Sequence, residues 1–242
     1  MSKLNLINFR DLAYLVNENG QHIKEGLIFR GPSLISRNLK EEDKPLIDDL
    51  KLKHIVDFRG IEEAEFHGFD YMPVGCIQAN ISALELEDKH NNPVELDKIE
   101  EKEHLRRIAW LKESYTKMPF NNPAYKYLIE CIRNFEAPIY MHCSVGKDRT
   151  GVAAMIVLKL LGFKEEMILA DYMLSKKNWL DFYAKVGKEE KDLSPMMLVR
   201  EEWLLGSMKA IKDKYGNDET YFLKEYGIDQ EELEKIRKYY LC

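Results

Sequence analysis

The chain has 242 residues, of which 45% are hydrophobic and 32% are charged, and its formal net charge is −6. This length suits one large domain, or one domain with an insertion, and the apolar fraction is enough for a substantial core. The acidic balance excludes a global positive field that would attract nucleic acid or an anionic membrane. An anionic substrate must therefore be bound by a local positive site.

The N-terminal residues lack the apolar stretch of a signal peptide, and no apolar run reaches the length that spans a membrane. Among the four cysteines there is no Cys-x-x-Cys pair, so we expect neither a structural zinc site nor a disulfide framework. We expect a cytoplasmic protein without metal or cofactor, in a reducing compartment that preserves a reactive thiol. Secretion without a cleaved signal stays open.

Hydrophobic patterning predicts short strands early in the chain and helices late in it. This order indicates a single domain over residues 1–242 of the α/β class, with a small central sheet flanked by helices. In chain order we expect a strand at 26–30, a helix at 38–50, strands at 53–59 and 73–78, a helix at 124–134, a strand at 137–141, a buried helix at 150–161 that ends at Gly162, and a helical part over 163–242, with one helix from Ser194-Pro195 to about Lys214 and one capped by Asp229 and Glu232.

Residues 83–118 differ from the rest of the chain. They are rich in Glu and Lys, and Leu105, Ile108 and Leu111 recur at helical spacing. We expect a helical insertion over or beside the sheet. It would serve either as a lid or as a solvated helical connection, and the sequence leaves both open.

The most informative stretch is His142-Cys143-Ser144-Val145-Gly146-Lys147-Asp148-Arg149-Thr150-Gly151, between the expected strand and the buried helix. A tight loop in this position can turn its amide N–H groups toward a tetrahedral anion, and the helix N-terminus adds about half a positive charge. Gly146 permits a backbone conformation that a side chain would resist. The stretch predicts a phosphate-binding loop formed by Ser144, Val145, Gly146, Lys147, Asp148 and Arg149.

The side chains of this loop suit phosphoryl transfer. A field that binds phosphate also favours the thiolate of Cys143, which can attack phosphorus and form a cysteinyl-phosphate. The planar fork of Arg149 matches two phosphate oxygens and stays charged. The Thr150 hydroxyl can donate to the departing sulfur. His142 either orients the loop through its imidazole or is a buried structural histidine.

Other kinds of loop fit less well. A Walker A loop needs a glycine where Met141 stands and Ser or Thr where Asp148 stands. A zinc site needs more thiols or imidazoles nearby. The remaining alternative is that Cys143 is a buried inert thiol, but the glycine, the Thr-Gly ending and the strand-to-helix context favour the functional interpretation.

The loop resembles the signature of cysteine-dependent protein tyrosine phosphatases, and its Gly-Lys-Asp-Arg-Thr-Gly version is similar to a bacterial branch of atypical tyrosine and dual-specificity phosphatases that is also associated with phosphoinositides. The resemblance spans about residues 5–180 and implies a tyrosine-phosphatase-like fold. Motifs similar to those of this branch stand, in order, at Asn8-Phe9-Arg10-Asp11-Leu12, Phe29-Arg30-Gly31, Val56-Asp57-Phe58-Arg59 and Asp171-Tyr172-Met173-Leu174-Ser175.

Two departures from the branch concern loop details rather than chemistry. Ala13-Tyr14 stands where the branch usually has Gly-Gly after the first motif, and Gly31 stands where it has Ser.

The site has two candidates for the general acid. No aspartate stands in a Trp-Pro-Asp-like context before the loop. The resemblance implies that Asp148, inside the phosphate loop, is the acid, as in myotubularin-like enzymes, and that it holds its proton beside an anionic ester. The rival candidate is Asp57 at the end of a strand, for which a salt bridge or turn role ranks slightly higher.

Lys147 would either bind a second phosphate, as a phosphoinositide head group carries, or be a solvated loop lysine. The leading function is a metal-independent phosphatase for phosphotyrosine proteins, with dual specificity open. The alternative is a phosphoinositide or inositol-phosphate phosphatase. A phosphate-recognition module has no need of Cys143, and a rhodanese-type sulfur transferase fits the Arg-Thr-Gly ending less well.

Overall fold

Five short strands form one sheet in the order β1-β2-β5-β3-β4. In this computed structural model, which describes residue 4 and residues 6–84, 101–193 and 197–242, β1 pairs antiparallel with β2 and the other neighbours pair in parallel. The strands are β1 (Arg10–Asp11), β2 (Ile28–Gly31), β3 (His54–Asp57), β4 (Ile77–Asn80) and β5 (Ile139–His142).

The parallel pairing brings three strand ends together. Gly31 of β2 and Asp57 of β3 both lie in register with His142, the last residue of β5. In sheets of this kind, ligands bind in the crevice outside the carboxyl ends of the strands. The loop that follows His142 therefore begins where the fold places a binding site.

Side chains of the central strands alternate between two buried faces, as the two-residue period of a strand requires. One face carries Phe29, Ile55 and Tyr140, which pack in a cluster with Ile47 of α1 (Asp43–Asp48). The opposite face belongs to a larger core formed with the remaining helices.

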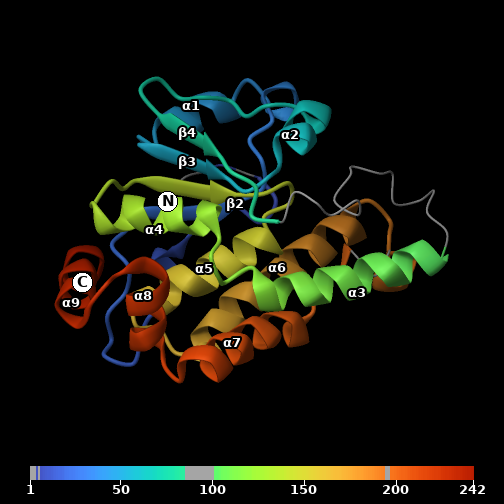
Figure 1. The fold of residues 1–242 in the computed structure, drawn as a ribbon. Coiled ribbons are helices and arrows are strands. Elements are labelled where there is room, and N and C mark those ends of the chain that lie inside the picture. The colour runs from blue at the N-terminus through green and yellow to red at the C-terminus, as the bar shows by residue number, and fades with distance from the viewer. Residues whose placement is uncertain (1–3, 5, 85–100, 194–196) are drawn as a thin grey trace.

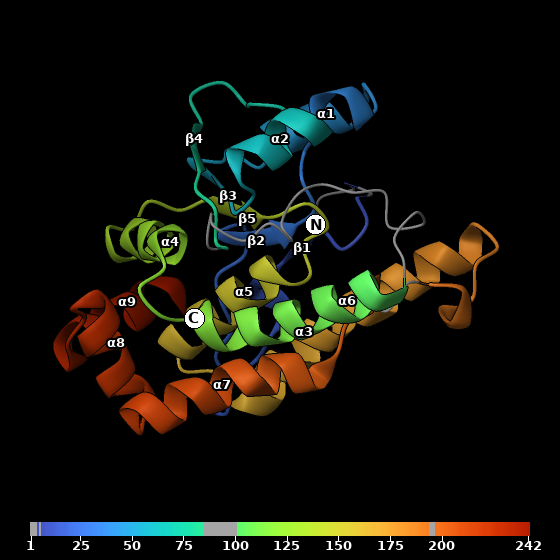
Figure 2. The same cartoon turned by 45° about the vertical axis from the view of Figure 1, so that its right-hand side comes forward.

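Helices cover both sides of the sheet, and the helices that follow β5 lie on one of them (Figure 1). α1 and α2 lie together on the other side, and α3 runs beside α7 in both views (Figure 2). The remaining helices are α2 (Ile61–His67), α3 (Glu101–Lys117), α4 (Pro123–Arg133), α5 (Arg149–Leu160), α6 (Glu165–Lys185), α7 (Glu201–Tyr215), α8 (Asp218–Tyr226) and α9 (Gln230–Tyr240).

The structure confirms the predicted α/β class and the small flanked sheet. Helices α6 to α9 follow after residue 163 in the described part of the chain. The expected helix at 38–50 is wrong in extent, because α1 begins only at Asp43, and Pro45, which has no N–H, must lie in a first turn. The helix expected from Ser194-Pro195 begins at Glu201, and residues 194–196 lie outside the described residues. The Asp229 cap is confirmed, since its side chain accepts from the amide of Glu232.

The described part of the expected insertion is α3. Leu111 and Tyr115 of this helix are buried in the main core, so the C-terminal half of α3 is not a solvated connection. Residues 85–100 lie outside the described residues, and the lid stays a prediction. The single domain over 1–242 also stays a prediction.

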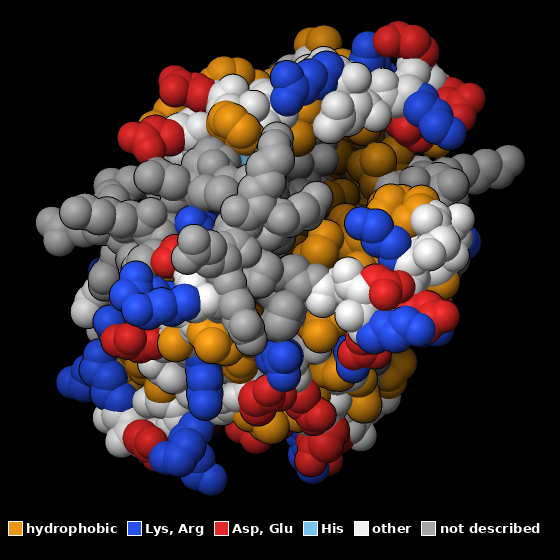
Figure 3. Space-filling model, turned by 90° about the vertical axis from the view of Figure 1, so that its right-hand side faces the viewer, with side chains coloured by type: hydrophobic (Ala, Val, Ile, Leu, Met, Phe, Trp, Pro, Cys, Tyr) orange, Lys and Arg blue, Asp and Glu red, His pale blue; other side chains and the backbone are white. Residues whose placement is uncertain are grey.

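The surface shows mixed charge. On the face in Figure 3, Lys and Arg side chains stand among Asp and Glu side chains instead of gathering into one basic patch. Over the described ranges, every helix is too short or too polar to cross a bilayer.

A buried ion cluster joins the N-terminal strands to α6. Asp171 of α6 accepts from Arg10 Nε at 2.7 Å and forms a second ion pair with Arg30 of β2. The Tyr14 hydroxyl also donates to Asp171, at 2.8 Å, so the departure at Ala13-Tyr14 adds a contact here. Burial opposes ionisation of Asp171, but the charges of Arg30 and Arg10 outweigh it and lower its pKa to about 2.

We predict that Asp171→Asn lowers the free energy of unfolding by about 3 kcal/mol at pH 7, because it leaves two buried arginines without a counter-ion. The pKa of Asp171 is lower in the folded than in the unfolded chain, so its contribution is complete above about pH 5 and is lost as the pH falls toward 2. Urea unfolding between pH 7 and pH 3 measures both effects. Asp213→Asn, which removes an exposed pair with Lys209, is the control and should cost under about 0.5 kcal/mol. Equal losses in the two variants would contradict the prediction.

Candidate active site

The predicted phosphate loop lies between β5 and the N-terminus of α5, with Cys143 almost fully buried at its base. α5 starts at Arg149, so the positive end of its dipole faces the loop. Gly146 has φ +71°, and a Cβ at this position would lie 2.2 Å from the carbonyl oxygen of Gly31. Only glycine fits there without moving β2, as the sequence predicted for the turn.

Three consecutive carbonyl oxygens of the loop accept hydrogen bonds from the surrounding scaffold. The Ser144 oxygen accepts from the amide and hydroxyl of Ser33, at 3.1 and 3.2 Å, and the Val145 oxygen accepts from Trp179 Nε1 at 3.2 Å. The Gly146 oxygen accepts at 2.9 Å from two side chains, Asn8 Nδ2 and Arg30 Nη2.

This anchoring determines where the amides point. In a planar trans peptide, the N–H of the next residue points opposite to the carbonyl. Because the carbonyls of residues 144–146 are held by the scaffold, the amides of Val145, Gly146 and Lys147 face the other way. The result is the group of convergent donors that an anion-binding loop requires.

The Cys143 thiol is set up to ionise. Burial raises its pKa, but the charge of Arg149 and hydrogen bonds from Thr150 outweigh burial and hold the pKa below the ordinary value of a thiol. Thr150 is fully buried, and its hydroxyl has no competing hydrogen-bond partner among the described residues, so its proton is available to the sulfur. The site therefore favours a thiolate nucleophile.

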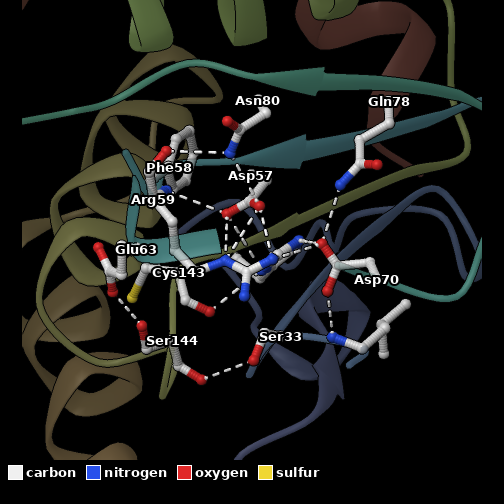
Figure 4. A network of polar contacts seen from close by, with 12 residues as sticks. Ser33, Asp57, Phe58, Arg59, Glu63, Asp70, Gln78, Asn80, Cys143 and Ser144 are labelled. Carbon is white, nitrogen blue, oxygen red and sulfur yellow. Dashed lines mark hydrogen bonds and ion pairs between the residues drawn. The ribbon is translucent and has the colours of Figure 1, made fainter. Parts of the chain in front are cut away.

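Arg149 is held by a carboxylate from a different element. Glu63 of α2 accepts from both terminal nitrogens of Arg149, at 2.6 and 2.9 Å. The Ser144 hydroxyl donates to the same carboxylate (Figure 4). Burial opposes ionisation of Glu63, but Arg149 and Ser144 lower its pKa to about 2. Glu63 thus binds the end of the Arg149 guanidinium. The side edge of the guanidinium, formed by the N–H of Nε and the second N–H of Nη2, is left for two oxygens of a phosphate group.

Sequence reasoning missed Glu63. The sequence offered only the pattern of a helix N-terminus. Gly60 ends the segment after β3, and Ile61-Glu62-Glu63 then places two acidic residues in the first turn of α2. Nothing in the sequence related that turn to a loop about 80 residues later.

His142 lies in a buried network behind the loop. Its Nδ1 donates to the Cys143 carbonyl at 3.0 Å, and its Nε2 lies 3.2 Å from Asp70. Burial opposes the charged form of His142, but Asp70 and Asp57 raise its pKa to about 9. The imidazole is therefore both buried and in contact with the loop, so the two predicted interpretations of His142 describe one arrangement.

Asp57 has the predicted salt-bridge geometry. It is 1% exposed and accepts from Arg59 through three nitrogen–oxygen contacts of 2.7–3.0 Å, with a further hydrogen bond from Asn80 (Figure 4). Both carboxylate oxygens are occupied by these donors. This geometry favours the structural interpretation of Asp57 over the rival assignment as a general acid.

Two groups of side chains among the described residues have the composition of a metal site. In the first, Asp57 and Asp70 lie beside His142, but both carboxylates already pair with Arg59, and protonated His142 cannot ligate. The second consists of His54, Cys131 and Glu136. Burial and the Glu136 charge raise the pKa of Cys131 to about 12, so its sulfur is a thiol in this structure.

Lys147 and Asp148 occupy the middle of the loop and contact each other. Lys147 is 6% exposed, so the interpretation as a solvated loop lysine is wrong. Its Nζ lies 3.0 Å from Asp148 Oδ2 and donates to the Leu198 carbonyl at 3.3 Å. Asp148 Oδ1 accepts from the Tyr115 hydroxyl at 2.7 Å, a contact from α3 that sequence reasoning did not predict.

A buried thiol with a lowered pKa, a fixed guanidinium and outward-anchored loop carbonyls at a helix N-terminus form the arrangement that phosphoryl transfer requires. The model of the tyrosine phosphatase family matches residues 2–242, and the chain belongs to this family. The predicted enzyme class, a cysteine-dependent phosphoric monoester hydrolase, is thereby confirmed.

Individual relatives agree with the family. The chain is 27% identical over 253 residues to a Cupriavidus necator protein that carries the name of a tyrosine-protein phosphatase, with 97% of this chain and 86% of that protein covered. It is 23% identical over 268 residues to the triple specificity protein phosphatase PtpB of Mycobacterium tuberculosis, with 95% of each covered. Among solved structures, the core catalytic domain of the PP-IP phosphatase SIW14 from S. cerevisiae aligns at 17% identity over 87% of this chain and 94% of that chain, with a TM-score of 0.37, too loose to compare residues.

We predict that Glu63→Gln lowers kcat by about tenfold or more, because the Arg149 fork loses the charged partner that orients it. Removal of this negative charge should at the same time lower the pKa of Cys143, which the pH dependence of inactivation by iodoacetate measures. Glu62→Gln, on the exposed side of the same helical turn, is the matched control. Unchanged kcat with an unchanged thiol titration would refute the role of Glu63.

Proposed function

We propose that this chain is a protein tyrosine phosphatase that hydrolyses phosphotyrosine through a cysteinyl-phosphate on Cys143. The observation that carries the proposal is the buried thiol with a lowered pKa at the base of a loop whose carbonyls are anchored outward. The names of the bacterial relatives support a protein substrate.

In the first proposed step, the Cys143 sulfur attacks phosphorus. The S–P bond forms, the ester P–O bond breaks, and Asp148 gives its proton to the leaving oxygen. In the second step, water attacks the cysteinyl-phosphate, the S–P bond breaks and Asp148 takes a proton from the water. Arg149 and the loop amides stabilise the charge on the phosphoryl oxygens in both steps, and Thr150 donates to the departing sulfur.

The second candidate function is hydrolysis of a phosphoinositide or inositol phosphate. Its support is the position of Lys147, a buried cation of the loop whose Nζ lies 3.0 Å from Asp148. A second phosphate would have to reach Lys147 within the loop. We rank phosphotyrosine first, because the named function of both bacterial relatives is that of a protein phosphatase.

The remaining parts of the proposal concern setting and partners. A phosphorylated molecule is the partner that the family implies. We propose a cytoplasmic location, where a reducing environment preserves the Cys143 thiol. We propose that nucleic acid is not a partner, because the net charge is −6.

We predict that the purified protein hydrolyses phosphotyrosine peptides after treatment with a chelator, and that Cys143→Ser reduces this activity by about 10³-fold or more. Parallel assays on phosphoserine peptides and phosphoinositides rank the two candidate functions. Cys242→Ser, which alters an exposed cysteine, is the control for loss of a thiol. Activity that persists in Cys143→Ser would overturn the cysteinyl-phosphate mechanism.

We predict that Asp148→Asn reduces kcat on aryl phosphates with poor leaving groups by about 10²-fold, because the leaving oxygen then departs without a proton. Aryl phosphates with activated leaving groups need no proton and should lose much less. A series of aryl phosphates of increasing leaving-group pKa measures the difference. Equal losses across the series would remove Asp148 from the role of acid.

A further inference from the structure

Tyr115 of α3 connects the phosphate loop to the helical part of the protein. Its side chain is fully buried, and its hydroxyl donates to Asp148 Oδ1 at 2.7 Å. Burial, reinforced by the negative charge of Asp148, raises the pKa of Tyr115 well above its ordinary value. The hydroxyl therefore keeps its proton at any physiological pH and acts as a permanent donor.

The direction of the hydrogen-bond chain follows from the number of protons. A tyrosine hydroxyl has one proton, and Tyr115 uses it on Asp148. In the 2.7 Å contact between the hydroxyls of Tyr115 and Tyr172, Tyr115 must then be the acceptor and Tyr172 the donor. Tyr172 of α6 thus donates a hydrogen bond to the Tyr115 hydroxyl oxygen.

The backbone and ring of Tyr115 are also fixed. The Ser207 hydroxyl of α7 donates to the Tyr115 carbonyl at 2.7 Å. The Tyr115 ring packs on Trp203 of α7, with 5.6 Å between ring centroids. The phenol therefore has little freedom to rotate away from Asp148, and its position depends on the contact between α3 and α7.

We propose that Tyr115 is a positioning residue for the proposed general acid: its hydroxyl holds Oδ1 of Asp148 toward α3, so that Oδ2 is the oxygen that carries the proton to the leaving group. This inference rests on the proposed function of Asp148. Tyr115 leaves Oδ2 unused, and the partner of Oδ2 is Lys147 of the loop, whose Nζ lies 3.0 Å away. A carboxylate without Tyr115 could rotate about its Cβ–Cγ bond and present either oxygen, or neither, to the leaving group.

The test uses Tyr115→Phe, which keeps the ring and its packing on Trp203 but removes the donor. We expect kcat to fall roughly tenfold on aryl phosphates with poor leaving groups, the effect typical of losing a hydrogen bond to a charged group. Loss on activated aryl phosphates should stay below about twofold, and KM should change little, since the loop amides and Arg149 are untouched. Asp148→Asn combined with Tyr115→Phe should be no slower than Asp148→Asn alone, because Tyr115 acts through Asp148.

Two further variants control for stability. Tyr221→Phe removes the hydroxyl of another fully buried tyrosine, which donates to the Pro119 carbonyl at 2.8 Å away from the loop, and should leave the leaving-group dependence unchanged. Tyr172→Phe removes the donor behind Tyr115 and should give a smaller loss with the same leaving-group dependence. If Tyr115→Phe does not fold, the result with Tyr172→Phe decides the question alone.

Each result separates the inference from the function on which it rests. If Asp148→Asn depends on the leaving group and Tyr115→Phe does not, only the role of Tyr115 is overturned. A second contrary result is that the double variant loses kcat relative to Asp148→Asn by the same factor that Tyr115→Phe loses relative to the unchanged protein. In that case Tyr115 acts independently of Asp148 and the inference is wrong. If Asp148→Asn shows no leaving-group dependence, the acid assignment fails and the role of Tyr115 fails with it, while Cys143→Ser still reports on the nucleophile.

Discussion

The site depends on the outward anchoring of three carbonyl groups in the phosphate loop. Without these hydrogen bonds, the peptide units of the loop could rotate and turn their carbonyl oxygens inward. An anion would then meet the negative ends of the peptide dipoles rather than the positive ends. The scaffold prevents this through Arg30, which donates to the Gly146 carbonyl and is itself held by Asp171. A buried ion cluster beneath the sheet edge thus determines the polarity of the loop above it.

The same logic explains how a chain with net charge −6 makes a site for anions. The acidic groups near the loop stand behind the cations: Glu63 pairs with Arg149, and Asp171 pairs with Arg10 and Arg30. Each carboxylate is ionised at neutral pH, since the pKa values of Glu63 and Asp171 are lowered to about 2. Fixed cations with fixed partners need little reorganisation when charge develops in a reaction.

How far sequence could predict this site depends on sequence separation. Cys143, Gly146 and Arg149 lie within one loop, so their spacing alone predicted the thiol, the turn and the guanidinium. Glu63 contacts Arg149 across 86 residues, and Tyr115 contacts Asp148 across 33. These contacts depend on sheet order and on how α2 and α3 pack, which hydrophobic periodicity does not specify. The fold class was predictable because the short apolar runs of the strands and the periodicity of the helices are local patterns. β1, with two residues, is too short for such a pattern.

The surroundings of Asp148 relate binding to proton transfer. In the site without substrate, the Asp148 carboxyl group is held by a hydrogen bond from Tyr115 and by an ion pair with Lys147. In the proposed reaction, a phosphate ester dianion in the loop competes with Asp148 for Lys147. Tyr115 keeps the carboxyl group in one orientation in both states, because a hydroxyl can donate to the carbonyl oxygen of a neutral carboxylic acid as well as to a carboxylate.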